Sequence, residues 1–303
     1  SGVTKTKGDK GKWFKNLKNI LSGYEGMIFT DVDAAEILPQ EMQSEEDTGS
    51  FIGEDVIANT MPLPEYGKAW QQSFSASSLQ QYNICQRSFY YHYILQMPPV
   101  EPQLNGENVI DARTFGTLMH EALEKYAGNV KKALMQAAYD NNLQDYDLSE
   151  AEKMLEKYLQ SNLYPGLEAK QLHETGFTLP VLAKYGINAQ CYGFIDNIIY
   201  NSDGSLSIID YKTGHVPDAL PKGYKYQLAL YKLAAEEMFS LPVKSAELHF
   251  LRGCVSFELP ADFNPEEIAA ELQSIFAKTD EREFTCSTAY CHSCPYAYFC
   301  KKI

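Results

Sequence analysis

Two aspartates and one lysine interrupt a pair of segments that otherwise read as apolar β-strands. Asp196 lies in the first segment, Asp210 and Lys212 lie in the second, and turn-forming residues at 201–205 separate them. Side chains alternate along a strand, so Asp210 and Lys212 point to the same face. A hairpin that closes within this turn brings Asp196 close to Asp210. The spacing therefore predicts two carboxylates and one ammonium group at one end of a sheet.

This trio suits phosphoryl chemistry. Two carboxylates can hold a hard divalent cation such as Mg²⁺, which lowers the pKa of a bound water and neutralises charge on a phosphoryl group. A lysine can orient that water or stabilise the developing charge. The alternative is a hairpin with surface charges, in which Asp210 and Lys212 form an exposed ion pair of little energetic value. Spacing alone leaves both interpretations open.

Four further motifs flank the hairpin in chain order. They are a segment over 75–91 that contains Cys85, a segment over 115–124 that contains His120, the pair Gln227-x-x-x-Tyr231, and the triplet Cys291-x-x-Cys294-x5-Cys300. Together with the hairpin, this series resembles the PD-(D/E)XK nuclease superfamily. It is most similar to the branch found at the ends of bacterial RecB- and AddAB-type helicase-nucleases and in CRISPR-associated adaptation nucleases. The resemblance extends in order from about residue 74 to residue 300.

The resemblance implies both a fold and an activity. The fold is α/β, with a restriction-endonuclease-like mixed β-sheet core flanked by helices, a helical insertion and a cysteine-rich C-terminal staple. The activity is that of a metal-dependent DNA nuclease, with Mg²⁺ or Mn²⁺ as the metal and single-stranded DNA or duplex ends as the substrate. Exonuclease action in DNA repair or recombination is expected, together with a helicase motor or partner subunit. No Walker motif occurs in this chain, so any motor lies elsewhere.

The same resemblance assigns the site. The catalytic set that it implies is His120, Glu174, Asp196, Asp210, Lys212, Gln227 and Tyr231. Within this set, His120, Asp196 and Asp210 are the expected metal ligands, and Lys212 is expected to position the attacking water. Glu174 would complete the acidic site.

Four members of this set have ordinary alternatives. A lone histidine on a helix, such as His120, is commonly a satisfied structural residue. Glu174, in a predicted strand, is equally well an edge residue. Gln227 and Tyr231 are spaced i and i+4, so they share a helix face, and polar residues of an ordinary core explain them as well.

The seven cysteines form the second candidate site. An odd count without a secretion signal argues against a disulfide framework and indicates a reducing, cytoplasmic setting. Cys291, Cys294 and Cys300 supply three local thiolates, and the resemblance adds Cys85. Four thiolates suit a [4Fe–4S] cluster, with zinc or no metal as alternatives and Cys286 as a competing ligand. Such a cluster would staple positions 206 residues apart, and an aerobically prepared sample could lack it.

Composition bounds these hypotheses. The chain has 303 residues and a net charge of −14, which is unusual for a nucleic-acid binder. Residues 25–55 hold ten acids and no lysine or arginine, so the rest of the chain carries only −4. We expect a basic helix and acidic connector over 1–70, interpreted as the end of a preceding domain, and the nuclease domain over 71–303. No apolar run is long enough to span a membrane, and the Ser1-Gly2 start suggests a fragment of a longer protein.

Two other functions remain open. One is a catalytically silent DNA-end-binding or scaffold module that keeps the fold, which the net acidity favours and the intact trio disfavours. The other is a sequence-specific restriction-type endonuclease with the same active centre.

Periodicity predicts the elements that carry these residues. Helices are expected from Ser75 up to the prolines at 98–99, and over 115–126, 131–141, 149–163, 224–239 and 265–278. Strands are expected over 171–180, 187–200, 206–212, 243–251 and 254–259. A short helix from residue 12 and a strand over 26–30 are expected in the N-terminal part. Two local predictions accompany them: a capping box that Ser149 opens, and core packing of the aromatic run 89–93, for which stacking on bases is the alternative.

Overall fold

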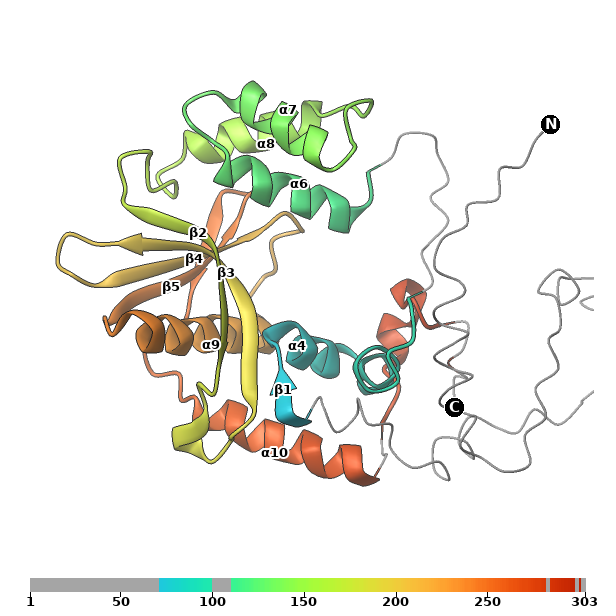
Figure 1. Ribbon diagram of the computed structural model, residues 1–303. Helices are drawn as coiled ribbons and strands as arrows, with labels where there is room; N and C mark the ends of the chain where they lie inside the picture. Colours follow the sequence, from blue (N-terminus) through green and yellow to red (C-terminus); the bar gives the residue numbers. More distant parts are fainter. Residues whose placement is uncertain (1–70, 100–109, 282–283, 298–299, 301–303) are drawn as a thin grey trace, which may run out of the picture. The chain divides into compact units, whose positions relative to one another are not determined.

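The computed structural model describes residues 71–99, 110–281, 284–297 and 300 (Figure 1). The helix expected from residue 12 and the strand expected over 26–30 lie outside the described residues. The predicted division of the chain at residue 70 therefore stays a prediction.

A six-stranded mixed sheet forms the core of the described part. Its strands are β1 (Ser73–Phe74), β2 (Gln171–Leu179), β3 (Gln190–Tyr200), β4 (Leu206–Lys212), β5 (Val243–Phe250) and β6 (Val255–Glu258). The order is β1-β3-β4-β5-β6, and β2 also pairs with β3. The β1–β3 and β4–β5 pairs are parallel and the others are antiparallel. The α/β fold with a mixed sheet is therefore confirmed.

Helices cover both faces of this sheet (Figure 1). The longer ones are α4 (Ala76–Ile84), α6 (Ala112–Glu124), α7 (Val130–Asp140), α8 (Ser149–Leu159), α9 (Lys222–Phe239) and α10 (Glu266–Glu281). Figure 1 shows α6, α7 and α8 together on one side of the sheet and α9 on the other. The apolar stripes of α6, α7 and α8 meet Ile209 and Tyr211 of β4 in one buried cluster. The predicted helical insertion is thus a layer of the fold, packed directly on the strand that carries Asp210.

The hairpin forms as its spacing predicts. β3 and β4 pair from Tyr200 and Leu206, beside the turn, as far as Asn197 opposite Ile209. Asp203 tightens the turn by accepting a hydrogen bond from the N–H of Ser205, and Gly204 adopts a φ of 83°, which glycine tolerates without strain. The ladder ends immediately before Asp196 and Asp210, so the carboxylates lie where the two strands part.

The first helical segment differs from its prediction. Ser75 caps α4 as expected, since its side chain accepts a hydrogen bond from the N–H of Ser78. The helix does not continue to the prolines, because Cys85 is extended, with φ −160° and ψ 113°. A short α5 (Gln86–Phe89) and a π-helix η2 (Tyr90–Ile94) follow. Leu79 and Tyr82 before Cys85, and Phe89 after it, lie on helices as their spacing predicted. That spacing did not reveal the break between the two helices.

Two local predictions have opposite outcomes. The capping box at Ser149 is wrong: Ser149 is the first residue of α8, and the carboxylate of Asp147 accepts its N–H at 2.9 Å. Core packing of the aromatic run is confirmed for Phe89, Tyr90 and Tyr91, which are all buried.

Candidate active site

Asp196 and Asp210 lie side by side in a buried position at the end of the hairpin ladder. Their exposed fractions are 8% and 1%. Asp196 Oδ2 accepts a hydrogen bond from the backbone N–H of Tyr211 at 2.7 Å. Lys212 Nζ lies 2.5 Å from Asp210 Oδ2. The alternative of an exposed surface ion pair is therefore wrong, because both carboxylates are buried and the Lys212 side chain is only 21% exposed.

Burial and mutual repulsion set the protonation of this group. Burial and the neighbouring charge of Asp210 raise the pKa of Asp196 to about 7, although His120 and Lys212 favour its ionised form. Burial alone would lower the pKa of Lys212, but the carboxylates of Asp210 and Asp196 outweigh it and raise that pKa. The site thus holds a charged ammonium beside two carboxylates that destabilise each other. A cation bound between acidic groups would relieve this repulsion.

Helix α6 brings His120 onto the same carboxylates. Its Nδ1 lies 3.4 Å from Asp196 Oδ2 and 3.7 Å from Glu174 Oε1, and its Nε2 lies 3.0 Å from the carbonyl oxygen of Tyr211. Burial lowers the pKa of His120, but the carboxylates of Glu174, Asp196 and Asp210 prevail and raise it to about 9. In the absence of a cation the imidazolium supplies part of the positive charge that the acids require.

Glu174 occupies a strained position on β2. The β2–β3 register places His173 opposite Asn197 and Thr175 opposite Ile195, so Glu174 stands across from Asp196. Its φ is 45°, in the left-handed region that non-glycine residues seldom adopt. Strained backbone of this kind persists where the surrounding structure enforces it, and it occurs frequently at functional sites.

The residues with suitable ligand atoms form a different trio from the expected one. One ligand atom each from His120, Glu174 and Asp196 lie within 4.8 Å of one another. Asp210 is held instead by Lys212 and by Gln227 of α9, whose Nε2 donates to Asp210 Oδ1 at 2.9 Å. Carboxylate oxygens with one imidazole suit Mg²⁺ or Mn²⁺ better than they suit softer metals.

Gln227 and Tyr231 lie beneath this site as their i, i+4 spacing requires. Gln227 Nε2 lies 3.1 Å from the hydroxyl oxygen of Tyr231 and is shared between that group and Asp210. Both residues are 7% exposed. Asp210 Oδ2 accepts no hydrogen bond of normal geometry, despite its contact with Lys212. This buried oxygen therefore keeps a lone pair that a cation or water could use.

The residues that join this site to the helical layer were not predicted from the sequence. The side chain of Asn197 donates to the hydroxyl of Tyr211 at 3.1 Å. Tyr158 of α8 lies 2.8 Å from Nδ1 of His249, and its ring meets that of Tyr211 edge-on. The sequence could have indicated a role for Asn197, because it is a second polar residue directly after Asp196 within an apolar strand. Tyr158 and His249 gave no local signal, because their partners are distant in the sequence.

Comparison with known proteins identifies the family of this chain. Residues 73–301 match the PD-(D/E)XK nuclease superfamily. The chain belongs to this superfamily. A stretch of 97 residues is 34% identical to an ATP-dependent helicase/nuclease subunit from Moorella thermoacetica; it covers 32% of this chain and 6% of that protein. The crystal structure of SSO0001 aligns with 65% of this chain and 88% of its own, at 18% identity and a TM-score of 0.32.

Enzymes of this superfamily are nucleases that use divalent metals. The similarity to a helicase/nuclease subunit supports the RecB-like branch. Within the part of the chain that the structure describes, no helix is both long and apolar enough to cross a membrane.

The cysteine-rich end of the described chain gathers thiols from both ends of the family match. Cys286 Sγ lies 3.7 Å from Cys291 Sγ and 3.6 Å from Cys300 Sγ. The N–H of Ser287 lies 3.4 Å from Cys85 Sγ. Cys294 makes none of these thiol contacts. Three of the four expected ligands, Cys85, Cys291 and Cys300, are therefore found around Cys286. Cys286 itself was expected only as a competing ligand.

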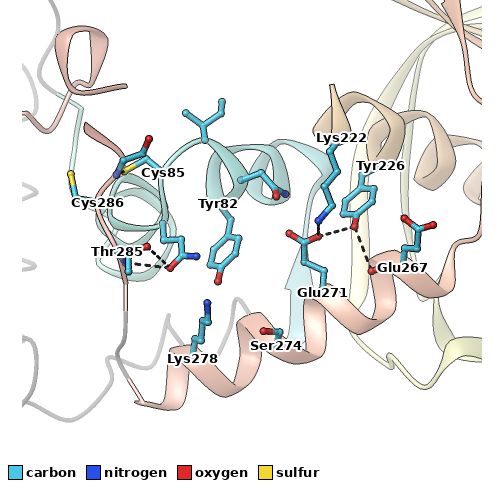
Figure 2. A pocket seen from close by; sticks show the side chains of 14 residues that line it. Tyr82, Cys85, Lys222, Tyr226, Glu267, Glu271, Ser274, Lys278, Thr285 and Cys286 are labelled. Carbon is cyan, nitrogen blue, oxygen red and sulfur yellow. Dashed lines mark hydrogen bonds and ion pairs between the residues drawn. The ribbon is translucent and has the colours of Figure 1, made fainter. Parts of the chain in front are cut away.

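A groove of about 660 Å³ opens beside these thiols (Figure 2). Cys85 and Cys286 border one end of it, and Lys222, Tyr226 and Glu271 border the other, as Figure 2 shows. Tyr226 donates its hydroxyl to Glu271 at 2.7 Å, and Lys222 forms an ion pair with the same carboxylate. The charges on this wall are thus already paired within the protein. Asp196 and Asp210 are absent from the lining of this groove.

Proposed function

We propose that this nuclease is a metal-dependent deoxyribonuclease that hydrolyses phosphodiester bonds at the end of the β3–β4 hairpin. The observation that carries the proposal is the buried convergence of Asp196, Asp210 and Lys212, with His120 and Glu174 against it. Burying two carboxylates together is costly unless a cation or a substrate uses them. A merely structural hairpin would gain nothing from this arrangement.

The chain's own residues have distinct roles in this proposal. His120, Glu174 and Asp196 would hold Mg²⁺ or Mn²⁺, with Asp210 beside them as the further carboxylate. When bound, the metal supplies charge neutralisation at the phosphate and a more acidic water. Lys212 positions the attacking water and donates hydrogen bonds to developing negative charge. The water oxygen bonds to phosphorus, the bond to the leaving oxygen breaks, and that oxygen gains a proton.

The surrounding contacts keep these groups in place. Gln227 fixes one oxygen of Asp210, and the N–H of Tyr211 fixes one oxygen of Asp196. The Tyr211 carbonyl accepts a hydrogen bond from His120 Nε2–H, which directs Nδ1 toward Asp196 and Glu174. The donors and acceptors are therefore oriented before the substrate arrives, so little reorganisation is needed during the reaction.

Exonuclease action beside a helicase motor, in DNA repair or recombination, is the biological setting that we propose. The support is the similarity to a helicase/nuclease subunit over about a third of this chain. A motor that unwinds a duplex would deliver single strands to the hairpin site.

We further propose a [4Fe–4S] cluster at the cysteine-rich end. Thiolates are the ligands that such clusters take, and five cysteines lie in the two segments that meet here: Cys85, Cys286, Cys291, Cys294 and Cys300. The thiol contacts of Cys286 make it a ligand candidate alongside Cys294. A cluster here would join the start of the domain to its end and act structurally.

Degradation of end-labelled linear DNA and of circular single-stranded DNA tests the proposed function. We expect the wild-type chain, with Mg²⁺ or Mn²⁺, to shorten linear DNA progressively and to spare the circle. Asp210→Asn should be inactive on both. Discrete fragments, or cutting of the circle, would instead indicate a restriction-type endonuclease.

A catalytically silent DNA-end-binding module is the second candidate, favoured by the net charge of −14. It predicts that a folded wild-type chain binds DNA ends but degrades nothing with either metal. It also predicts that Asp210→Asn leaves DNA processing by the parent complex unchanged.

A further inference from the structure

The β2–β3 ribbon carries two exposed aromatic side chains next to the catalytic carboxylates. Phe194 is 62% exposed and Tyr192 is 40% exposed, although both lie within a central strand of the sheet. Figure 1 shows β3 continuing away from the α6–α8 layer toward β1. The aromatic run at 89–93 was the sequence-based candidate for base stacking, but Phe89, Tyr90 and Tyr91 are buried. The exposed aromatic residues belong to the strand of Asp196 instead.

Strand alternation places these rings on the side of the ribbon that carries the acidic site. Phe194 stands opposite Gly176 and Tyr192 stands opposite Thr178. Residues two apart on a strand point to the same face, and directly opposed residues share it. Tyr192, Phe194 and Asp196 therefore line one face of β3. Gly176 and Thr178 are exposed on β2, so they leave this face open.

The ring of Phe194 has one covered side and one free side. A Cβ added at Gly176 would lie 3.0 Å from Phe194 Cε1, which shows that the ring rests directly over that glycine. Covering a glycine explains the position of the ring. It does not explain why so large an apolar side chain remains 62% exposed.

The spacing along β3 matches a strand of nucleic acid that leaves the active site. At about 3.4 Å per residue, Phe194 lies roughly 7 Å and Tyr192 roughly 14 Å along the strand from Asp196. A phosphodiester at Asp196 would thus have its neighbouring bases within reach of the two rings. Unpaired bases stack readily on aromatic side chains, whereas bases in a duplex already stack on each other.

Helix η2 extends this aromatic surface. Burial raises the pKa of Tyr93 to about 12, and the nearby Tyr192 contributes to the shift. The exposed ring of His92 meets that of Tyr93 edge-on, with centroids 4.6 Å apart.

We infer that Phe194, with Tyr192 next to it, is a stacking platform for the bases of a single-stranded nucleic acid whose scissile phosphodiester lies at Asp196. The inference rests on the proposed function and adds substrate selectivity to it. Single strands gain the stacking energy and duplexes do not.

Equilibrium binding of a short fluorescein-labelled oligothymidylate, and of an abasic strand of the same length, tests this platform. Both are measured with Mg²⁺ in an Asp210→Asn background, which keeps the probes uncut. We expect Phe194→Ala and Phe194→Leu to weaken oligothymidylate binding about 5- to 100-fold. Phe194→Trp should preserve the affinity, and its indole emission should be quenched when the oligothymidylate binds. Met135→Ala, which changes a 69% exposed side chain on α7, is the control and should change nothing.

The abasic strand separates stacking from a general loss of structure. It should bind more weakly to the parent, and Phe194→Ala should have no further effect on it. Equal weakening of both probes, or unchanged oligothymidylate binding in Phe194→Ala, would overturn the platform. If the wild-type chain degrades single-stranded DNA in that case, the proposed function survives alone. If neither probe binds and nothing is degraded, both proposals fail.

Discussion

The hairpin site and the cysteine-rich end are built in opposite ways. At the hairpin site, β2, β3, β4, α6 and α9 each contribute at least one side chain, and backbone or amide groups orient Asp196 and Asp210. At the cysteine-rich end, the N–H of Ser287, which precedes the short 3₁₀ helix η4 (Thr288–Ser293), donates to Cys85 Sγ at 3.4 Å, and thiol–thiol contacts of 3.6–3.7 Å join Cys286 to Cys291 and Cys300. Thiols are weak hydrogen-bond partners. The comparison teaches that oriented hydrogen bonds hold the groups of the hairpin site, whereas weak thiol contacts hold those of the cysteine-rich end.

The largest effect that separates the two regions is expected from Asp196→Asn. It should lower the rate of DNA cleavage on the order of 10³-fold, because a metal ligand contributes several kcal/mol to the transition state. It should not destabilise the fold, since the neutral amide no longer repels Asp210. Asp203→Asn, in the exposed turn of the same hairpin, is the matched control and should retain activity. Single-turnover cleavage and urea unfolding measure the two quantities; strong destabilisation by Asp196→Asn would contradict this account.

The pH dependence of stability tests the burial of Asp196 in a second way. The pKa of Asp196 is raised in the fold from 3.8 to about 7, so its protonated form favours folding. That contribution is present below the unfolded-state pKa and is lost as pH rises through about 7. In metal-free protein, the free energy of unfolding should therefore fall as the pH rises from 3.8 to about 7. In Asp196→Asn, this pH-dependent fall should be smaller. Urea midpoints at several pH values would show it, and a rise over the same range would be inconsistent with the burial described.

The second largest effect concerns the cysteine-rich end. Cys300→Ser should remove iron, sulfide and visible absorption from anaerobically purified protein, while Cys254→Ser, a cysteine outside this group, should keep them. Since the cluster would close a loop of about 200 residues, its loss should lower the free energy of unfolding by several kcal/mol. A colourless protein with stoichiometric zinc would refute the cluster. Cys286→Ser and Cys294→Ser, compared in the same assay, identify the fourth ligand.

A smaller effect is expected in the groove beside the cysteine-rich end. Tyr226→Phe removes one hydrogen bond to Glu271, while Lys222 still pairs with that carboxylate. It should cost about 1 kcal/mol of stability and leave cleavage unchanged. Thermal unfolding together with the cleavage assay measures both; a large fall in cleavage would mean that this groove belongs to the reaction.

The sequence predicted the elements that a local pattern specifies. The strand over Leu206–Lys212 has the predicted bounds, and α9 places Gln227 and Tyr231 on one face as predicted. The apolar neighbours of Asp196 and Asp210 favoured burial without deciding it, and both side chains are buried. Each of these depends on residues close in the chain, for which periodicity and alternation suffice.

The remaining features depend on contacts between distant residues. The extended backbone at Cys85 accompanies its meeting with Ser287, about 200 residues later, and no local pattern shows that. The position of the Phe194 ring depends on Gly176, which belongs to the neighbouring strand and lies directly beneath it. The candidate ligand trio contains Glu174, whereas the predicted one contained Asp210. This difference depends on the directions of the side chains where the hairpin ladder ends.

The central claim is that the buried trio on the hairpin hydrolyses phosphodiester bonds. Cleavage of single-stranded DNA with Mg²⁺ or Mn²⁺ by the wild-type chain, Lys212→Ala and Lys222→Ala tests it most directly. We predict a loss on the order of 10²–10³-fold for Lys212→Ala and full activity for Lys222→Ala, whose lysine pairs with Glu271 outside the site. Equal cleavage by all three proteins would contradict the claim and place the chemistry elsewhere.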